Sequence, residues 1–178
     1  DTRLMNELST LAFVARKENV IFLGPPGVGK THLAVGLAMK AIQSGMTVYY
    51  TELSKLIADL KKAEEQNRLE RRWRVYARPD ILIVDEVGYM QLDRTSAELF
   101  FRLICTRYER GSIILTSNKF FSDWGELMSD AAIATAMLDR LLHHAHVVNI
   151  RGESYRLKDR LKTGVLTAPP ADIPVAEH

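Results

Sequence analysis

Residues 24–31 read Gly-Pro-Pro-Gly-Val-Gly-Lys-Thr, with the apolar run 20–23 before them and a segment of helical periodicity after them. The three glycines allow successive backbone N–H groups to converge on phosphate oxygens, and the start of the helix adds its positive dipole. Lys30 would neutralise the β and γ phosphates, and the Thr31 hydroxyl would bind Mg²⁺. We therefore predict a site for ATP and Mg²⁺, whose nucleotide-binding residues are Gly24, Pro25, Pro26, Gly27, Val28, Gly29, Lys30, Thr31 and His32.

Two adjacent acids, Asp85 and Glu86, end the apolar run 81–84. Acids at the carboxyl end of a parallel strand lie where ligands bind in such sheets. Asp85 would hold Mg²⁺ together with Thr31 or through water, and Glu86 would polarise the attacking water. A pair of acids after a strand is commonly only a solvated turn, but the phosphate loop favours ATP hydrolysis here.

Asn118 follows Thr116 and Ser117 at the end of another apolar run. A Ser-Asn pair after a strand is usually a turn. If this strand lies beside the strand that precedes the phosphate loop, Asn118 would lie between the γ phosphate and the attacking water. We favour that second interpretation, in which Asn118 senses the γ phosphate.

Five apolar runs must position these residues: 19–23, 46–51, 81–85, 112–116 and 146–150. Segments of helical periodicity separate them, which predicts an α/β fold with a five-stranded parallel sheet and helices on both faces. One helix should cover residues 31–44 and stop at Gly45. A second should begin near Thr95, with Glu98 completing a capping box, and end at Gly111. The apolar spacing of Leu4, Leu8, Leu11 and Val14 predicts a further helix near the start.

The length of 178 residues and the 47% hydrophobic content suit a single domain. The net charge of +2 does not by itself indicate a nucleic-acid binder. Cys105 lies in an apolar stretch and is expected to be a buried thiol in a reducing compartment. No apolar run is long enough to cross a bilayer, so we expect a cytoplasmic protein without a membrane partner. The absence of an initial Met suggests that the core at 1–162 is N-terminally trimmed. Residues 163–178 are rich in Pro and Ala and have no periodicity, so we expect a disordered tail there.

The order of the motifs GPPGVGKT, ILIVDE, TSN, LDRLL and GESYR resembles that of the AAA+ ATPases of the helicase-loader branch. The sequence is most similar to IstB-like proteins, the ATP-dependent helpers of transposition in bacterial insertion sequences, and more distantly to the helicase loader DnaC. The resemblance covers about residues 6–161. It implies a P-loop NTPase core of the AAA+ type, and the short segment after the last strand suggests a reduced or absent lid domain.

The same resemblance assigns roles to single residues. Lys30 and Thr31 match the Walker A motif, Asp85 and Glu86 the Walker B motif, and Asn118 sensor 1. Arg140 falls at the arginine finger that acts on a neighbouring subunit, and Arg156 falls at sensor 2, which would also contact the nucleotide. Spacing alone would leave both arginines as surface ion pairs, although guanidinium groups suit phosphate.

Members of this family form ring-like or helical homo-oligomers with double-stranded DNA along the inner surface. The segment 52–79, which is locally basic, occupies the place of an extra helical element that approaches DNA in this branch. Phosphate contacts are expected from Lys61, Lys62, Arg68, Arg71 and Arg72. The alternative is a solvated helix with paired charges.

The resemblance thus predicts a DNA-dependent ATPase that assists a transposase, with a replicative helicase loader as the alternative. A small-molecule kinase would need an acceptor pocket and a lid, whereas the adjacent acids and Asn118 suit water as the acceptor. A module that binds ATP only as a structural ligand would have no use for Glu86.

Overall fold

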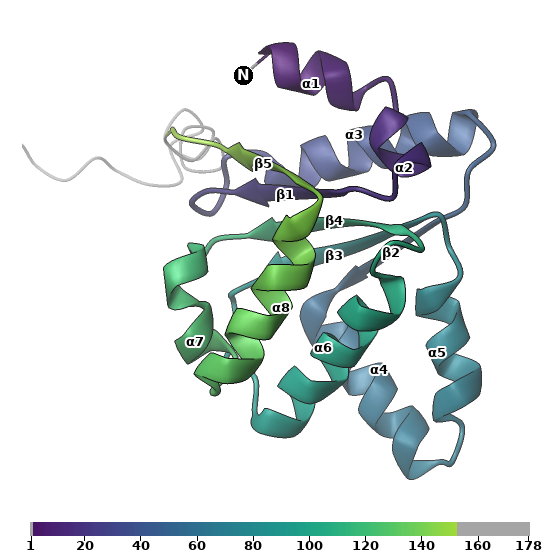
Figure 1. Ribbon diagram of the computed structural model, residues 1–178, viewed down its shortest axis with the longest axis vertical. Coiled ribbons are helices and arrows are strands. Elements are labelled where there is room, and N and C mark those ends of the chain that lie inside the picture. Colours follow the sequence, from purple (N-terminus) through teal and green to yellow (C-terminus); the bar gives the residue numbers. More distant parts are fainter. Residues whose placement is uncertain (1, 153–178) are drawn as a thin grey trace, which may run out of the picture.

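The computed structural model describes residues 2–152, and its centre is a five-stranded parallel sheet (Figure 1). The strands lie in the order β2-β3-β4-β1-β5, with every neighbouring pair parallel. Their bounds are β1 Asn19–Leu23, β2 Val48–Glu52, β3 Ile81–Val87, β4 Ser112–Ser117 and β5 Ala145–Asn149. The five predicted strands are confirmed, and β4 lies beside β1 as the argument for Asn118 required.

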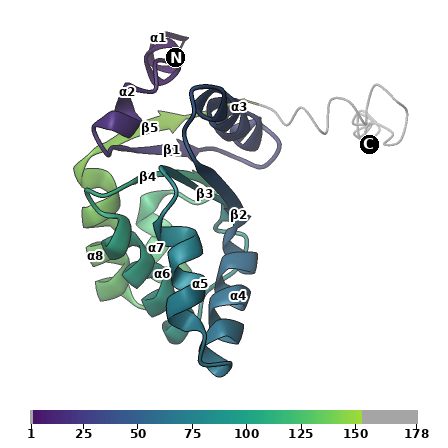
Figure 2. The same cartoon turned by 90° about the vertical axis from the view of Figure 1, so that its right-hand side faces the viewer.

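Helices cover both faces of the sheet, as predicted (Figures 1 and 2). One face carries α1 Thr2–Leu8, α2 Ala12–Ala15 and α3 Lys30–Gln43. The other carries α4 Leu53–Glu65, α5 Leu69–Ala77, α6 Arg94–Arg107, η1 Phe121–Asp123, α7 Trp124–Leu127 and α8 Ala131–His143. Among residues 2–152, no helix has the length and apolar character to cross a bilayer.

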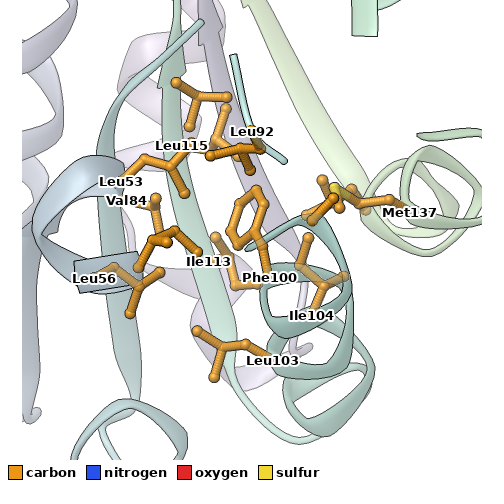
Figure 3. Packing of buried hydrophobic residues seen from close by; sticks show 14 of the residues in the cluster. Leu53, Leu56, Val84, Leu92, Phe100, Leu103, Ile104, Ile113, Leu115 and Met137 are labelled. Carbon is orange, nitrogen blue, oxygen red and sulfur yellow. The ribbon is translucent and has the colours of Figure 1, made fainter. Parts of the chain in front are cut away.

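Alternate residues of the central strands belong to two separate hydrophobic cores, one on each face of the sheet. Val20 and Phe22 of β1 pack toward α3, while Ile21 and Leu23 pack into the larger core on the opposite face. Figure 3 shows part of the larger core, where Phe100 of α6 lies among strand residues and Met137 of α8. Because both faces of the strands are buried, the runs are continuously apolar, and this made them recognisable in the sequence.

The helix expected from about Thr95 starts as predicted, at Arg94, but it ends at Arg107 rather than at Gly111. Its N-cap is Asp93, whose side chain accepts a hydrogen bond from the Ser96 N–H at 2.8 Å. Glu98 therefore completes no capping box, and its carboxylate instead pairs with Arg94 at 3.1 Å. Aspartate is a strong N-cap residue, and its position three residues before Ser96 suits this bond.

The first predicted helix is interrupted at Leu11, which adopts a left-handed backbone with φ of 61°. Leu11 and Phe13 are both buried, although two residues separate their directions by about 200° on a straight helix. The break allows both side chains to enter the core. Cys105 is half-buried rather than fully buried. Arg156, the expected lid region and the tail 163–178 lie outside the described residues.

Candidate functional site

The phosphate loop connects the carboxyl end of β1 to the first turn of α3, at the edge of the sheet where ligands of α/β proteins bind. Gly29 is the N-cap residue of α3 and has a left-handed φ of 95°. Gly24 lies close to Ile150, the residue directly after β5, and a Cβ at Gly24 would stand 2.4 Å from the Ile150 carbonyl oxygen. The loop therefore needs glycine at both positions for its shape. Val28 is buried, while Pro25, Pro26 and His32 are exposed.

Lys30 has only 6% of its surface exposed, and its ammonium group lies against the loop itself. Its Nζ donates hydrogen bonds of 2.7 Å to the carbonyl oxygens of Gly24 and Pro25. The positive charge is thus held at the centre of the loop, beside the N-terminus of α3. Both features favour an anion there.

Asp85 is the buried carboxylate of the site, with 2% exposure at the carboxyl end of β3. Its Oδ1 accepts hydrogen bonds from the Thr31 hydroxyl at 3.1 Å and from the Thr116 hydroxyl. Its Oδ2 accepts a bond of 2.6 Å from the Tyr50 hydroxyl. Burial, and then this bond to Asp85, raises the pKa of the Tyr50 phenol and so favours the protonated form that donates the bond. A carboxylate and a hydroxyl next to a phosphate loop are the oxygen ligands that Mg²⁺ prefers.

A β-bulge separates the two adjacent acids. Val84 pairs with Leu115 and Val87 pairs with Ser117, so that Asp85 and Glu86 together face Thr116. Glu86 has a left-handed φ of 61°, and its N–H donates to the Thr116 hydroxyl at 3.0 Å. The bulge leaves Asp85 buried and Glu86 exposed. The two carboxylates can therefore act separately, one on a metal ion and the other on a water molecule.

Asn118 lies directly after β4 and packs against the turn that follows Glu86. Its N–H donates to the Val87 carbonyl at 3.3 Å. Its side-chain Oδ1 is buried and has no hydrogen-bond partner among residues 2–152. A Cβ at Gly88 would stand 2.3 Å from this oxygen, so only glycine permits the approach. The structure thus brings Asn118 beside the two acids.

Arg140 lies elsewhere, near the C-terminal end of α8. Its Nη1 donates to the Ala136 carbonyl at 3.2 Å, and its guanidinium lies over the Phe101 ring, 5.2 Å from the centroid. With Lys17 and Asn19 it lines a small cavity at the amino end of β1. The phosphate loop follows the other end of that strand, so Arg140 is not part of the cluster around Asp85.

The basic segment forms a hairpin of α4 and α5, and its predicted DNA contacts divide into two groups. Lys61 pairs with Asp93 at 2.9 Å, and Arg72 pairs with Asp59. These two fit the alternative of paired charges. The exposed basic residues of this segment that form no ion pair within residues 2–152 are Lys62, Arg68, Arg71, Arg74 and Arg78.

Four residues were not predicted from the sequence: Arg74, Arg78, Tyr50 and Thr116. Arg74 and Arg78 line one groove along α5 together with the predicted Arg71, and the spacing of three and four residues could have shown this face. Tyr50 and Thr116 were missed because their roles depend on strand pairing. Tyr50 pairs with Ile83, two residues before Asp85, so the alternation of side chains places it on the same face as Asp85.

The sequence is similar to a family of ATP-binding proteins. The model of the IstB-like ATP binding protein family matches residues 1–163. The putative ATP-binding protein of insertion sequence IS21 from Pseudomonas aeruginosa is 57% identical over 167 residues, which are 94% of this chain and 63% of that protein. The corresponding protein of IS5376 from Geobacillus stearothermophilus is 51% identical over 160 residues, which are 90% and 64% of the two chains. The chain therefore spans less than two thirds of either relative.

Solved structures share the fold. The crystal structure of the DnaC helicase loader has a TM-score of 0.68 at 23% identity and covers 81% of this chain and 87% of its own. The replication initiator DnaA bound to AMPPCP and single-stranded DNA has a TM-score of 0.69 at 22% identity, with 94% and 53% covered. The chain thus has the AAA+ P-loop fold that was predicted.

The bulge leads to a prediction about stability. In Thr116→Val, the Asp85 Oδ1 loses one donor and the Glu86 N–H loses its acceptor, and we expect the free energy of unfolding to fall by about 1–3 kcal/mol. Urea unfolding measures this. The matched control is Thr135→Val, because the exposed Thr135 hydroxyl donates only to the Ala131 carbonyl of its own helix. Equal losses in the two variants would contradict the structural role of Thr116.

Proposed function

This chain belongs to the family of IstB-like ATP-binding proteins, and on that premise we propose that it hydrolyses ATP with water and uses its nucleotide state to control assembly on DNA. The observation that carries the proposal is the hydrogen bond of 3.1 Å from Thr31, at the end of the phosphate loop, to the buried Asp85. It brings the phosphate-binding and acid-bearing segments together, although 54 positions separate the two residues.

Each residue of the site would have one task. The loop N–H groups and Lys30 bind the β and γ phosphates, and Thr31 and Asp85 hold Mg²⁺, which when bound would neutralise phosphate charge. Glu86, exposed next to Asp85, orients the attacking water and takes its proton. Asn118, beside the same turn, contacts the γ phosphate or that water. Arg156 is proposed to contact the nucleotide as well.

The site would be completed by a second copy of the chain. Arg140 lies at the amino end of β1 while the phosphate loop follows the carboxyl end, which supports action of Arg140 on the nucleotide of a neighbour. We therefore propose a ring or helical filament of subunits with ATP at each junction. A neighbouring guanidinium would neutralise charge that develops on the γ phosphate.

The proposed partners are double-stranded DNA and a transposase, in the cytoplasm. The names of both quoted relatives place them in insertion sequences, which favours transposition over helicase loading. The exposed arginines of the α4–α5 hairpin support DNA binding through phosphate contacts, because they are available to a polyanion. Co-purification of a longer protein that contains this chain with a transposase, rather than with a replicative helicase, would decide between the two partners.

The role of Glu86 can be tested by Glu86→Gln. Because the amide keeps the shape but cannot take a proton, we expect ATP binding to persist while phosphate release falls by about 10²–10⁴-fold. DNA-bound assemblies should then last longer. The control is Glu98→Gln, an exposed residue paired with Arg94 on α6. Phosphate release by Glu86→Gln at the rate of the unsubstituted chain would refute the catalytic assignment.

Mixing two inactive variants tests the shared site. Arg140→Ala keeps its own loop, and Lys30→Ala keeps its arginine, so mixed assemblies would contain some junctions with both residues intact. We expect phosphate release from the mixture to exceed that of either variant alone at the same total protein concentration. A mixture no more active than the sum of its parts would exclude action of Arg140 on a neighbour.

The contribution of α5 can be measured by the salt dependence of DNA binding. Loss of one phosphate contact in Arg74→Ala should weaken binding to a similar extent for all sequences and reduce the slope of log K against log salt by about 1. The control is Lys40→Ala on α3, which covers the opposite face of the sheet. Identical slopes for Arg74→Ala and the control would remove α5 from the DNA-binding surface.

A further inference from the structure

Tyr50 connects the edge of the sheet with the buried carboxylate of the site. It belongs to β2, at the edge of the sheet, and 44% of its surface is exposed. Its hydroxyl nevertheless reaches Asp85, which is 2% exposed, and donates to Oδ2 at 2.6 Å. The side chain thus extends from the exposed edge of the sheet to the centre of the site.

The two oxygens of Asp85 have different partners. Oδ1 accepts from Thr31 and Thr116, which belong to α3 and β4. Within residues 2–152, the hydrogen bond to Oδ2 comes from Tyr50. Rotation about the Cβ–Cγ bond moves both oxygens, so the bonds to Oδ1 restrict this rotation and the bond from Tyr50 to Oδ2 restricts it further. The Tyr50 hydroxyl therefore fixes the orientation of the group, as well as its position.

We propose that Tyr50 is a positioning residue for Mg²⁺-dependent nucleotide binding, and that its hydroxyl holds the Asp85 carboxylate in the orientation that the Mg²⁺ ion or its bound water requires. This inference rests on the proposed function of Thr31 and Asp85. Hydrogen-bond partners of a ligating carboxylate orient it and commonly affect metal affinity as strongly as tenfold or more. Tyr50 acts on the nucleotide only through Asp85 and the Mg²⁺ ion. Its effect should therefore appear only when Mg²⁺ is present.

The neighbouring Tyr49 is a matched comparison within the same strand. Successive residues of a strand point to opposite faces. Tyr49 accordingly packs edge-on against Tyr76 of α5, with ring centroids 5.2 Å apart, and is partly buried against the core on the other side of the sheet. Tyr49→Phe therefore removes one hydroxyl oxygen from the same strand, as Tyr50→Phe does, but leaves the hydrogen bonds of Asp85 intact.

The experiment is a Mg²⁺ titration of the binding of a fluorescent ATP analogue to the chain, to Tyr50→Phe and to Tyr49→Phe. We expect Tyr50→Phe to raise the Mg²⁺ concentration at half-maximal binding by about tenfold. Tyr49→Phe should leave it unchanged. Binding of the analogue in EDTA should be the same for all three proteins, because the phosphate loop is intact. Thermal unfolding of the two variants, which a purely structural role would change, is measured in parallel.

A Tyr50→Phe midpoint equal to that of the unsubstituted chain would overturn the inference. So would a lower midpoint, since that would mean that the hydroxyl competes with the metal ion for Asp85. Failure of the proposed function gives a different result: the unsubstituted chain itself, and Tyr49→Phe with it, would bind the analogue without any dependence on Mg²⁺.

Discussion

The burial of the Asp85 carboxylate constrains the whole structure around the site. An ionised carboxylate away from water costs several kcal/mol unless hydrogen bonds replace its hydration. Here the bonds come from Thr31 at the start of α3, Tyr50 on β2 and Thr116 on β4. Three elements must therefore be assembled around β3 before the charge is stabilised. The same contacts join the phosphate loop to the acids, so correct folding and formation of the site depend on one set of interactions.

The β-bulge follows from this constraint. In a regular strand, consecutive residues would direct Asp85 and Glu86 to opposite faces of the sheet, and one of the two acids would enter the apolar core that Leu115 and Val84 help to form. The extra residue in β3 allows Glu86 to remain exposed while staying next to Asp85. A left-handed backbone at a non-glycine residue costs about 1–3 kcal/mol, and the hydrogen bond from Glu86 to Thr116 partly offsets it. Gly88 then lets the chain turn closely against Asn118.

Much of this arrangement could be predicted from the sequence, because the features involved are local. The five strands were recognisable as apolar runs, and the phosphate loop has a fixed spacing that reflects the shape of its backbone. The acids and Asn118 could be located because they follow strands directly. The partners of Asp85 could not, since Tyr50 and Thr116 reach it only through pairing across three strands. The ion pairs of Lys61 and Arg72 likewise depend on how α4 packs against α5 and α6, which the basic composition of the segment did not indicate.

Arg140 and the phosphate loop lie at opposite ends of β1. β1 has five residues, and at about 3.3 Å per residue its two ends lie about 13 Å apart. Arg140 shares a cavity with Asn19 at one end, whereas the phosphate loop begins after Leu23 at the other. Its guanidinium is also held by the Ala136 carbonyl and the Phe101 ring, on the side of the sheet opposite α3. An arginine so placed cannot serve the nucleotide site of its own chain without crossing the sheet. If it acts on ATP at all, it acts on the ATP of another subunit, and under the proposed function an isolated subunit would hold a complete phosphate loop and metal site but an incomplete transition-state site.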